Sequence, residues 1–485
     1  TDASATASFA FTPDLSSRTT LGVQYYHNRA RATAASGTQL TLGTKSVTAS
    51  AQKNASEGTA ESVTTGAFVE QQLGWRERLF LTAGLRADDN SAFGQNLDVT
   101  YYPKIGASFV VLDAENEPVL GVLGSLRLRA AWGASGVAPG TTDALRFFSS
   151  ANASVLGVDQ PGVIIGAIGN VELKPERSQE VEAGLDAGLV GGRVNLELTY
   201  YRKKTEDALI SRQLAPSLGV AAARFENLGS VLNEGFEAAV DARVLTLSNV
   251  QWDLRVSGSH NKNELLELGE GVSPILILSG RQRHIEGYPL GGYWGRRMSF
   301  SDANDDGIIT PNEITRETDA EFLGNVFPAN QMSVSSSLTL FSRLRVGVLF
   351  DHAGDYLNYW IGEQVRCQNL ICRGLNDPSA PLFDQARAVN AISDPDAAHT
   401  PYMEDASFWK LRELSFTLLA PQRWARAIGA ENLNLVVTGR NLKTWTDYSG
   451  FDPEVSGLGQ QAFLQIEEFT IPPVRAWTAR VNVGF

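Results

Sequence analysis

Alternation of apolar and polar residues runs through most of this chain of 485 residues and constrains its fold more than any other feature. In the segment 193–203, Val194, Leu196, Leu198 and Tyr200 alternate with polar neighbours. A strand directs successive side chains to opposite faces, so this segment has one apolar face and one polar face. A helix would scatter the same apolar residues around its axis.

The same alternation recurs along the chain, with Phe80 as an exception, in the windows 79–86, 126–133, 181–187, 236–242, 252–257 and 343–350. Long capped helices are not apparent, so we expect a nearly all-β chain. Gly191-Gly192 predicts a two-residue hairpin between strands 179–190 and 193–203. The long connections 137–173 and 356–402 predict loops, and short turns with long loops are typical of outer-membrane barrels.

Two all-β architectures fit this period: a soluble sandwich or propeller, and a transmembrane barrel with a wet interior. The period alone does not separate them. The strands are long, and aromatic residues stand at expected strand ends, where a membrane girdle would lie. These aromatic residues are Tyr25-Tyr26, Trp75, Tyr101-Tyr102 and Tyr200-Tyr201.

The last strand favours the barrel. Trp477, Ala479, Val481, Val483 and Phe485 are all apolar and alternate with Thr, Arg, Asn and Gly. A terminal amphipathic strand that ends in Phe resembles the signal read by the outer-membrane assembly machinery, and we assign that role to Trp477, Val481, Val483 and Phe485. A soluble edge strand can show the same pattern.

The composition of the chain argues against other classes of protein. No stretch of about 18 apolar residues occurs, which excludes a helical membrane protein but not a barrel. The net charge of −13, from 41 basic and 54 acidic residues, argues against a nucleic-acid partner. The chain starts without Met and without a signal peptide, so we expect that processing or truncation removed an export signal.

Cys367 and Cys372 stand in a loop-like stretch and are expected to form a disulfide in an oxidising compartment. Two free thiols are the alternative. A zinc site is not expected, because no further ligands stand at suitable spacing.

The segment 302–313 fits the twelve-residue calcium loop. Gly307 would make the sharp turn, and the predicted ligands are Asp302, Asn304, Asp306, the carbonyl of Ile308 and Glu313. Hard Ca²⁺ needs several oxygens from a short segment, and this spacing supplies them. We expect a structural Ca²⁺ that stiffens an extramembrane loop, with an Asp/Asn/Gly-rich turn without metal as the alternative.

No catalytic residues emerge, so we expect no enzyme and no required cofactor. The five histidines are scattered, and no nucleophile elbow or metalloprotease motif is present. Substrate-binding residues are not identifiable. Arginines on the expected interior face would contact substrate or a plug, or would be ordinary charges balanced by acidic neighbours. They are Arg127, Arg129, Arg343, Arg345 and Arg440.

Several segments resemble the SusC/RagA family of TonB-dependent outer-membrane receptors. Residues 173–184 read LKPERSQEVEAG, like the widespread strand L-K-P-E-x-S-x-x-x-E-x-G. Residues 195–207 and 227–237 resemble two further receptor strands. Residues 439–442 and 448–454, with the loop at 302–313, resemble the SusC-like branch. Leu411 and Leu414 break the parity of their strand, which predicts a bulge there.

This resemblance implies the C-terminal portion of a transmembrane antiparallel up-and-down β-barrel over 1–485, with extracellular loops at roughly 136–173, 301–328 and 355–403. It implies TonB-dependent import of a bulky nutrient, an oligosaccharide or a peptide, across the bacterial outer membrane. The expected partners are the TonB–ExbB–ExbD system, a SusD-like surface lipoprotein, outer-membrane lipid and the nutrient. The family's N-terminal plug is not visible in this sequence, which we interpret as truncation, or else as a plug-less channel.

Two other functions stay open at this stage. A passive porin-like channel would also show two-faced strands. A surface adhesin or an enzyme-bearing barrel would need a large folded extracellular insertion, and the loops look too small for one.

Overall fold

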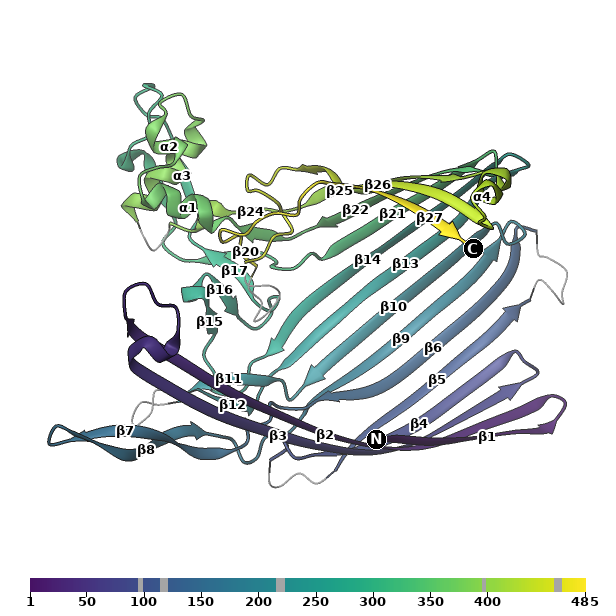
Figure 1. The fold of residues 1–485 in the computed structure, drawn as a ribbon, viewed down its shortest axis with the longest axis horizontal. Helices are drawn as coiled ribbons and strands as arrows, with labels where there is room; N and C mark the ends of the chain where they lie inside the picture. The colour runs from purple at the N-terminus through teal and green to yellow at the C-terminus, as the bar shows by residue number, and fades with distance from the viewer. Residues whose placement is uncertain (95–98, 114–120, 215–222, 395–397, 458–464) are drawn as a thin grey trace. The chain divides into compact units, whose positions relative to one another are not determined.

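The structure is a computed structural model that describes residues 1–94, 99–113, 121–214, 223–394, 398–457 and 465–485. Within these residues, fifteen strands form one sheet whose order follows the chain (Figure 1). Neighbouring strands run antiparallel wherever their register is described. We call it the long sheet. It confirms the prediction of an all-β, antiparallel, up-and-down fold.

The strands of the long sheet are β1 (Asp2–Thr12), β2 (Leu15–Leu40), β3 (Ser50–Trp75), β4 (Leu79–Asn90), β5 (Thr100–Leu112), β6 (Leu123–Val137), β9 (Glu176–Leu189), β10 (Val194–Glu206), β13 (Ser230–Leu247), β14 (Val250–Glu267), β21 (Asn330–Leu340), β22 (Leu344–Gly354), β25 (Phe408–Leu419), β26 (Asn432–Thr446) and β27 (Ala476–Gly484). Gly191 and Gly192 make the turn between β9 and β10, and both have positive φ, as the predicted tight hairpin requires.

The chain divides into two compact units. The first comprises Thr1–Phe109, Arg129–Val181 and Lys203–Ser230, and the second comprises Val110–Leu128, Glu182–Arg202 and Val231–Phe485. In the first unit, β2 and β3 pair along their whole length, from Leu15–Trp75 to Leu40–Ser50. Two hairpins complete this unit: β7 (Arg146–Val155) with β8 (Val158–Ile168), and β11 (Leu209–Gln213) with β12 (Ala223–Asn227).

Two placements of aromatic pairs at strand ends were wrong. Tyr200 and Tyr201 lie in the middle of β10. Tyr25 and Tyr26 lie in the middle of β2, because β2 and β3 continue well beyond the ends of β1 and β4. The distal part of this ribbon is rich in Ala, Ser, Thr and Gly. It therefore lacks the apolar alternation by which its length could have been predicted.

In the second unit, the predicted bulge is confirmed. Leu411 and Glu413 face consecutive residues of β22, so Arg412 is the extra residue of β25. The register against β26 shifts at the same place. A bulge re-aims side chains locally. Here Arg412 reaches Asp351 at 2.8 Å and both carboxylate oxygens of Glu454 at 2.7 and 2.8 Å.

The long connections of the second unit fold into short strands and helices. Residues 268–329 and 355–407 together form what we term the loop subdomain. Its strands are β15 (Ile275–Ile277), β16 (Gln282–His284), β17 (Gly292–Gly295), β18 (Met298–Phe300), β19 (Ile314–Arg316), β20 (Glu321–Gly324), β23 (Leu357–Tyr359) and β24 (Met403–Asp405). Its α-helices are α1 (Ile361–Gln368), α2 (Arg373–Asn376) and α3 (Leu382–Ser393), which lie together in Figure 1.

Helix α3 has twelve residues and no side-chain cap, and no pattern in the sequence predicted it. Residues 385–391 of this helix are all buried, so no polar face gives it the usual amphipathic period. Gly374 permits the close approach of α2, since a Cβ there would stand 2.2 Å from the carbonyl oxygen of Asp384. A fourth short helix, α4 (Gln422–Ala427), joins β25 to β26. None of the helices in the described ranges is long and apolar enough to cross a membrane.

The loop subdomain and Ile466 share an apolar cluster of buried residues, which includes Tyr293, Tyr359, Tyr402 and Cys367. Tyr359 pairs with Ile466 in an isolated parallel bridge. The segment 465–467 is thereby held inside the subdomain. The loop subdomain thus has a core of its own, separate from the two-faced strands.

Candidate functional site

The register of the second unit sorts side chains into apolar and polar rows. One apolar row crosses six strands and consists of Val250, Leu340, Leu344, Leu418, Leu435 and Val481. A second apolar row, two positions along, consists of Trp252, Leu338, Val346, Phe416, Val437 and Ala479. Many of these side chains are exposed, including Leu418, Leu435 and Val481. We term this side of the sheet the apolar face.

Polar residues fill the rows between. The row just beyond the second apolar row consists of Asp253, Ser337, Gly347, Ser415, Thr438 and Thr478. The row between the two apolar rows is polar except for Val436 and consists of Gln251, Thr339, Arg345, Thr417, Val436 and Arg480. Several charges on this polar face are paired, including Arg255 with Asp241 at 2.7 Å and Arg440 with Glu413 at 3.0 Å. Exposed apolar rows that alternate with hydrated polar rows are the pattern of a sheet between lipid and a watery interior.

Aromatic side chains mark the loop-side edge of the apolar face. His352 stacks on Trp409 with ring centroids 4.7 Å apart, and Trp409 pairs with Trp445. The His352 row lies eight positions from the Leu344 row along β22, which is about 26 Å of strand at about 3.3 Å per residue. A strand tilt of about 40° reduces this to roughly 20 Å across a membrane, near the height of an outer-membrane apolar band.

The first unit repeats this spacing. Trp75 pairs with Leu79 at one edge, and Tyr101 pairs with Ala87 at the other. Leu79 and Ala87 are again eight positions apart on β4. In each of the two units, the edges of the apolar face are therefore eight positions apart along a strand.

The assembly-signal residues lie on β27 or directly after it. Trp477, Val481 and Phe485 are 58%, 62% and 85% exposed, and Val483 is also exposed. They continue the apolar rows, because Val481 pairs with Leu435 and Val483 pairs with Leu433. Recognition by an assembly machinery stays a prediction.

The predicted calcium loop folds as a compact turn closed by its own carboxylates. Asp302 accepts hydrogen bonds from the amides of Asp306 at 3.1 Å and Gly307 at 2.9 Å. Glu313 reaches back across the loop and accepts from the amides of Ala303 and Thr310, both at 2.9 Å. The Thr310 and Ala303 amides hold the pKa of Glu313 below its usual range. Glu313, the twelfth residue of the loop, therefore lies beside Asp302, the first. The predicted metal ligands all offer oxygen atoms, and oxygen ligands fit Ca²⁺.

Helix α3 anchors this loop. The amide of Ile309 donates to the side-chain oxygen of Gln385 at 3.0 Å, and the Gln385 amide donates to Gly307 O at 3.0 Å. Ile309 is buried against Ala386 and Val389. Arg316, just beyond the loop, donates to Asn390 at 2.6 Å.

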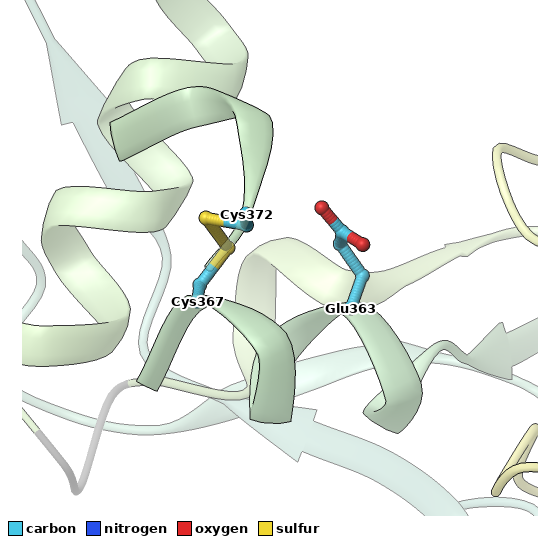
Figure 2. A group of neighbouring side chains, drawn as sticks. All are labelled: Glu363, Cys367 and Cys372. Carbon is cyan, nitrogen blue, oxygen red and sulfur yellow. A yellow bond between two sulfur atoms is a disulfide. The ribbon is translucent and has the colours of Figure 1, made fainter. Parts of the chain in front are cut away.

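Cys367 and Cys372 form a disulfide with their Cα atoms 4.7 Å apart, at the end of α1 and the start of α2. Figure 2 shows Glu363 of α1 beside the two sulfurs. Because the sulfurs are bonded to each other, this group offers no thiolate ligand to a metal. The disulfide lies in the core of the loop subdomain.

Two further features escaped prediction. Arg281 and Arg283 share one face of the β16–β17 pair, because Arg281 lies opposite Trp294 and Arg283 opposite Gly292. Burial, and then Arg281, lowers the pKa of the neighbouring His399 to about 4. The second feature is a cavity of about 330 Å³ lined by Asn233, Asn261, Asn263 and Asn325. Neither follows from any motif, since both depend on residues far apart in sequence.

Together the two-faced long sheet and its aromatic edges define a membrane-spanning β-sheet protein. The chain matches the family described as TonB dependent receptor-like, beta-barrel, over residues 1–359. It therefore belongs to the TonB-dependent receptor β-barrel family, and it is an outer-membrane protein.

Relatives support this membership. The chain is 26% identical over 465 residues to TonB-dependent receptor P26 of Formosa agariphila, covering 85% of this chain and 45% of the relative. It is 26% identical over 433 residues to TonB-dependent receptor SusC of Bacteroides thetaiotaomicron, covering 81% and 42%. The chain thus spans about half the length of the curated relatives it matches.

Among solved structures, a chain of the RagAB peptide transporter superposes with a TM-score of 0.81 at 18% identity. The match covers 100% of this chain and 55% of that one. At this identity the likeness establishes the fold. The resemblance to the SusC/RagA type, first seen in the motifs, is confirmed.

Proposed function

We propose that this chain is the barrel portion of a TonB-driven importer that carries a bulky nutrient, an oligosaccharide or a peptide, across the outer membrane. Membership of the TonB-dependent receptor family, combined with a polar face of paired charges inside an apolar band, carries the proposal. The TonB–ExbB–ExbD system would supply the energy. A SusD-like surface lipoprotein would cover the entrance on the side of the loop subdomain.

The folded loop subdomain supports import rather than passive conduction. A porin needs an open entrance, whereas here residues 268–329 and 355–407 form a packed body with a core, helices and a disulfide. A rigid body of this kind offers a surface on which a cargo or a lid protein docks. The calcium loop is part of the same body, and we propose a structural Ca²⁺ there.

Energy dependence is the decisive test. Cells that express the full-length receptor are supplied with panels of single polysaccharides or peptides as the sole nutrient. Growth that the receptor supports, and that is lost on deletion of tonB, is the expected result. Growth that survives that deletion would favour the passive channel. Conductance in planar bilayers provides the matched measurement, because a porin conducts without TonB.

A further inference from the structure

We propose that the asparagine-lined cavity is a subsite for one residue of an uncharged saccharide at the entrance of the barrel. The inference deepens the proposed import function and rests on it for the identity of the cargo. The inference is based on the position of the cavity, the chemistry of its walls and the pairing of the charged side chains in those walls.

The cavity lies just outside the membrane band, on the loop side. The register places Gly258 of β14 opposite Met332 and Met332 opposite His352, so Gly258 belongs to the aromatic row that ends the apolar face. Asn261 and Asn263 lie three and five positions further along the same strand. They share the parity of Asp253, so they project from the polar face.

The walls come from two parts of the second unit. Strands β13 and β14 supply Asn233, Asn261 and Asn263, whereas the loop subdomain supplies the stretches 287–290 and 325–329. A volume of about 330 Å³ falls within the usual range of small-ligand sites, about 300–1,000 Å³. A cavity of this size can hold one sugar ring. Its opening leaves room for the rest of an oligosaccharide.

The amides are held in place but keep donors. Asn263 accepts from the amide of Leu290 at 2.8 Å and donates to Asn233 Oδ1 at 2.9 Å. Asn261 accepts from the hydroxyl of Tyr201 at 2.8 Å. Each carboxamide has two N–H groups, so in the described part of the chain Asn261 keeps both and Asn263 keeps one. Fixed amides with unused donors are prepared to bind hydroxyl oxygens without losing further freedom.

The charges of the cavity point to a neutral ligand. Lys262 is paired with Glu264 at 2.7 Å, and the ring of His260 is hydrogen-bonded to Asn330 at 2.8 Å. An anionic ligand would therefore find no unpaired cation on these walls. Asp355 also lines the cavity and would repel a carboxylate or sulfate.

A saccharide fits better than a peptide. Hydroxyl groups both donate and accept, as carboxamides do, so a sugar ring can use Asn233, Asn261 and Asn325 in either direction. Phe327, which packs against the core cluster of the loop subdomain, also lines the cavity and adds an apolar part of the wall that the C–H face of a sugar can contact. Peptides are commonly bound along an open strand edge or through charged groups at their termini. Along the cavity the edge of β14 is already hydrogen-bonded to the loop subdomain, since Asn261 N donates to Ala329 O and Leu265 N donates to Tyr288 O, both at 2.9 Å.

The test is binding of the detergent-purified full-length receptor to immobilised probes. Three sets are compared: neutral hexasaccharides of glucose, mannose, xylose and galactose, their sulfated or uronate counterparts, and short peptides. We expect retention of a neutral hexasaccharide. Asn261→Ala and Asn233→Ala should each weaken it about tenfold, the equivalent of one hydrogen bond to a polar ligand.

Phe327→Leu keeps an apolar wall but removes the ring, and it should weaken binding without altering the asparagines. Asn195→Ala is the matched control, since Asn195 lies on β10 and lines a different cavity of the same unit. Heat-modifiable migration on gels verifies that each variant is folded. If one asparagine variant fails to fold, the other and Phe327→Leu still decide the question.

The proposal is overturned if neutral saccharides are not retained, or if the variants retain them like the unaltered receptor. Retention of the anionic set alone would instead assign recognition to the Arg281 and Arg283 face. Retention of peptides alone would assign the cargo to that class. Binding in detergent needs no TonB, so a receptor that binds but does not import would refute the transport function and leave this subsite intact.

Discussion

The ammonium group of Lys410 lies 2.6 and 2.8 Å from the two carboxylate oxygens of Asp452, and both side chains are almost fully buried. The same nitrogen reaches Glu454 at 2.6 Å. This network ties the loop after β26 to the start of strand β25. It extends to Arg412, the bulge residue, through Glu454.

Replacement of this lysine should be strongly destabilising. Lys410→Met leaves a buried carboxylate without its cation, and we expect a loss of about 3–5 kcal/mol in the free energy of unfolding. Denaturant titration of the detergent-solubilised protein measures it. The control is Arg297→Met, which breaks the exposed pair with Glu321 and should cost less than about 1 kcal/mol. Equal losses in the two variants would contradict the assignment.

Gln385 is expected to hold the calcium loop against α3. Gln385→Leu removes the partners of Ile309 N and Gly307 O in a buried place, at a cost of about 1–3 kcal/mol. Hydrogen exchange should accelerate at residues 307–310. Gln368→Leu, on the exposed end of α1, is the control and should leave exchange in the loop unchanged. Unchanged protection in Gln385→Leu would show that apolar packing of Ile309 suffices.

Calcium should protect the loop from proteolysis. In the absence of metal, Asp302 and Glu313 bind the loop's own amides, and Ca²⁺ would recruit these oxygens into one coordination sphere. Cleavage within 300–315 should be slower with calcium than with a chelator. Glu313→Gln should abolish the difference, because it removes the bidentate ligand, whereas Glu317→Gln should retain it. Equal cleavage with calcium and with chelator in the unaltered protein would count against a metal.

Apart from the length of β2 and β3, the sequence was sufficient to predict the long sheet, because the apolar alternation of each strand is visible within that strand. Val481 and Leu435 belong to the apolar face whatever their partners, since the period of two is local to each strand. The bulge at Arg412 was predictable for the same reason, as Leu411 and Leu414 break the parity of one strand. The hairpin at Gly191-Gly192 likewise depends on adjacent residues.

The loop subdomain was not predictable because its determinants are distant in sequence. Helix α3 is covered on all sides, and its contact with Ile309 joins residues 76 positions apart. Asn233 and Asn263 meet only because β13 and β14 are neighbours in the sheet. The motif at 302–313 identified oxygen donors in one turn, but it contains no information about Gln385.

Glu467 should make the segment 448–455 sensitive to pH. This carboxylate is 1% exposed and accepts from Tyr448 Oη at 3.0 Å and from the amide of Phe451 at 3.1 Å. Burial raises its pKa above the ordinary value. A raised folded-state pKa means that the stabilisation is present in acid and is lost as the pH rises through that pKa. Protection of residues 448–455 from hydrogen exchange should therefore fall as the pH rises above the range in which a free glutamate titrates.

Glu467→Gln is the discriminating variant for this effect. The amide oxygen can still accept from Tyr448 and Phe451, but it has no charge to desolvate. Protection should be higher than in the unaltered protein at neutral pH and should no longer vary with pH. Glu468→Gln, at the exposed neighbouring position, serves as the control. A pH dependence that persists in Glu467→Gln would assign the titration to another group.

The apolar face can be tested with two neighbouring residues of β25. Leu418 belongs to an apolar row and is 39% exposed, whereas Thr417 points to the other face, opposite Arg345. Leu418→Lys would place an ammonium group in hydrocarbon and should cost up to about 2–4 kcal/mol, less near an interface. Thr417→Lys places the same group in a hydrated interior and should cost little. Folding into lipid vesicles, followed by denaturant titration, compares the two. If both lysines are tolerated equally, the rows of Val and Leu do not face lipid, and the membrane-spanning interpretation of this unit fails.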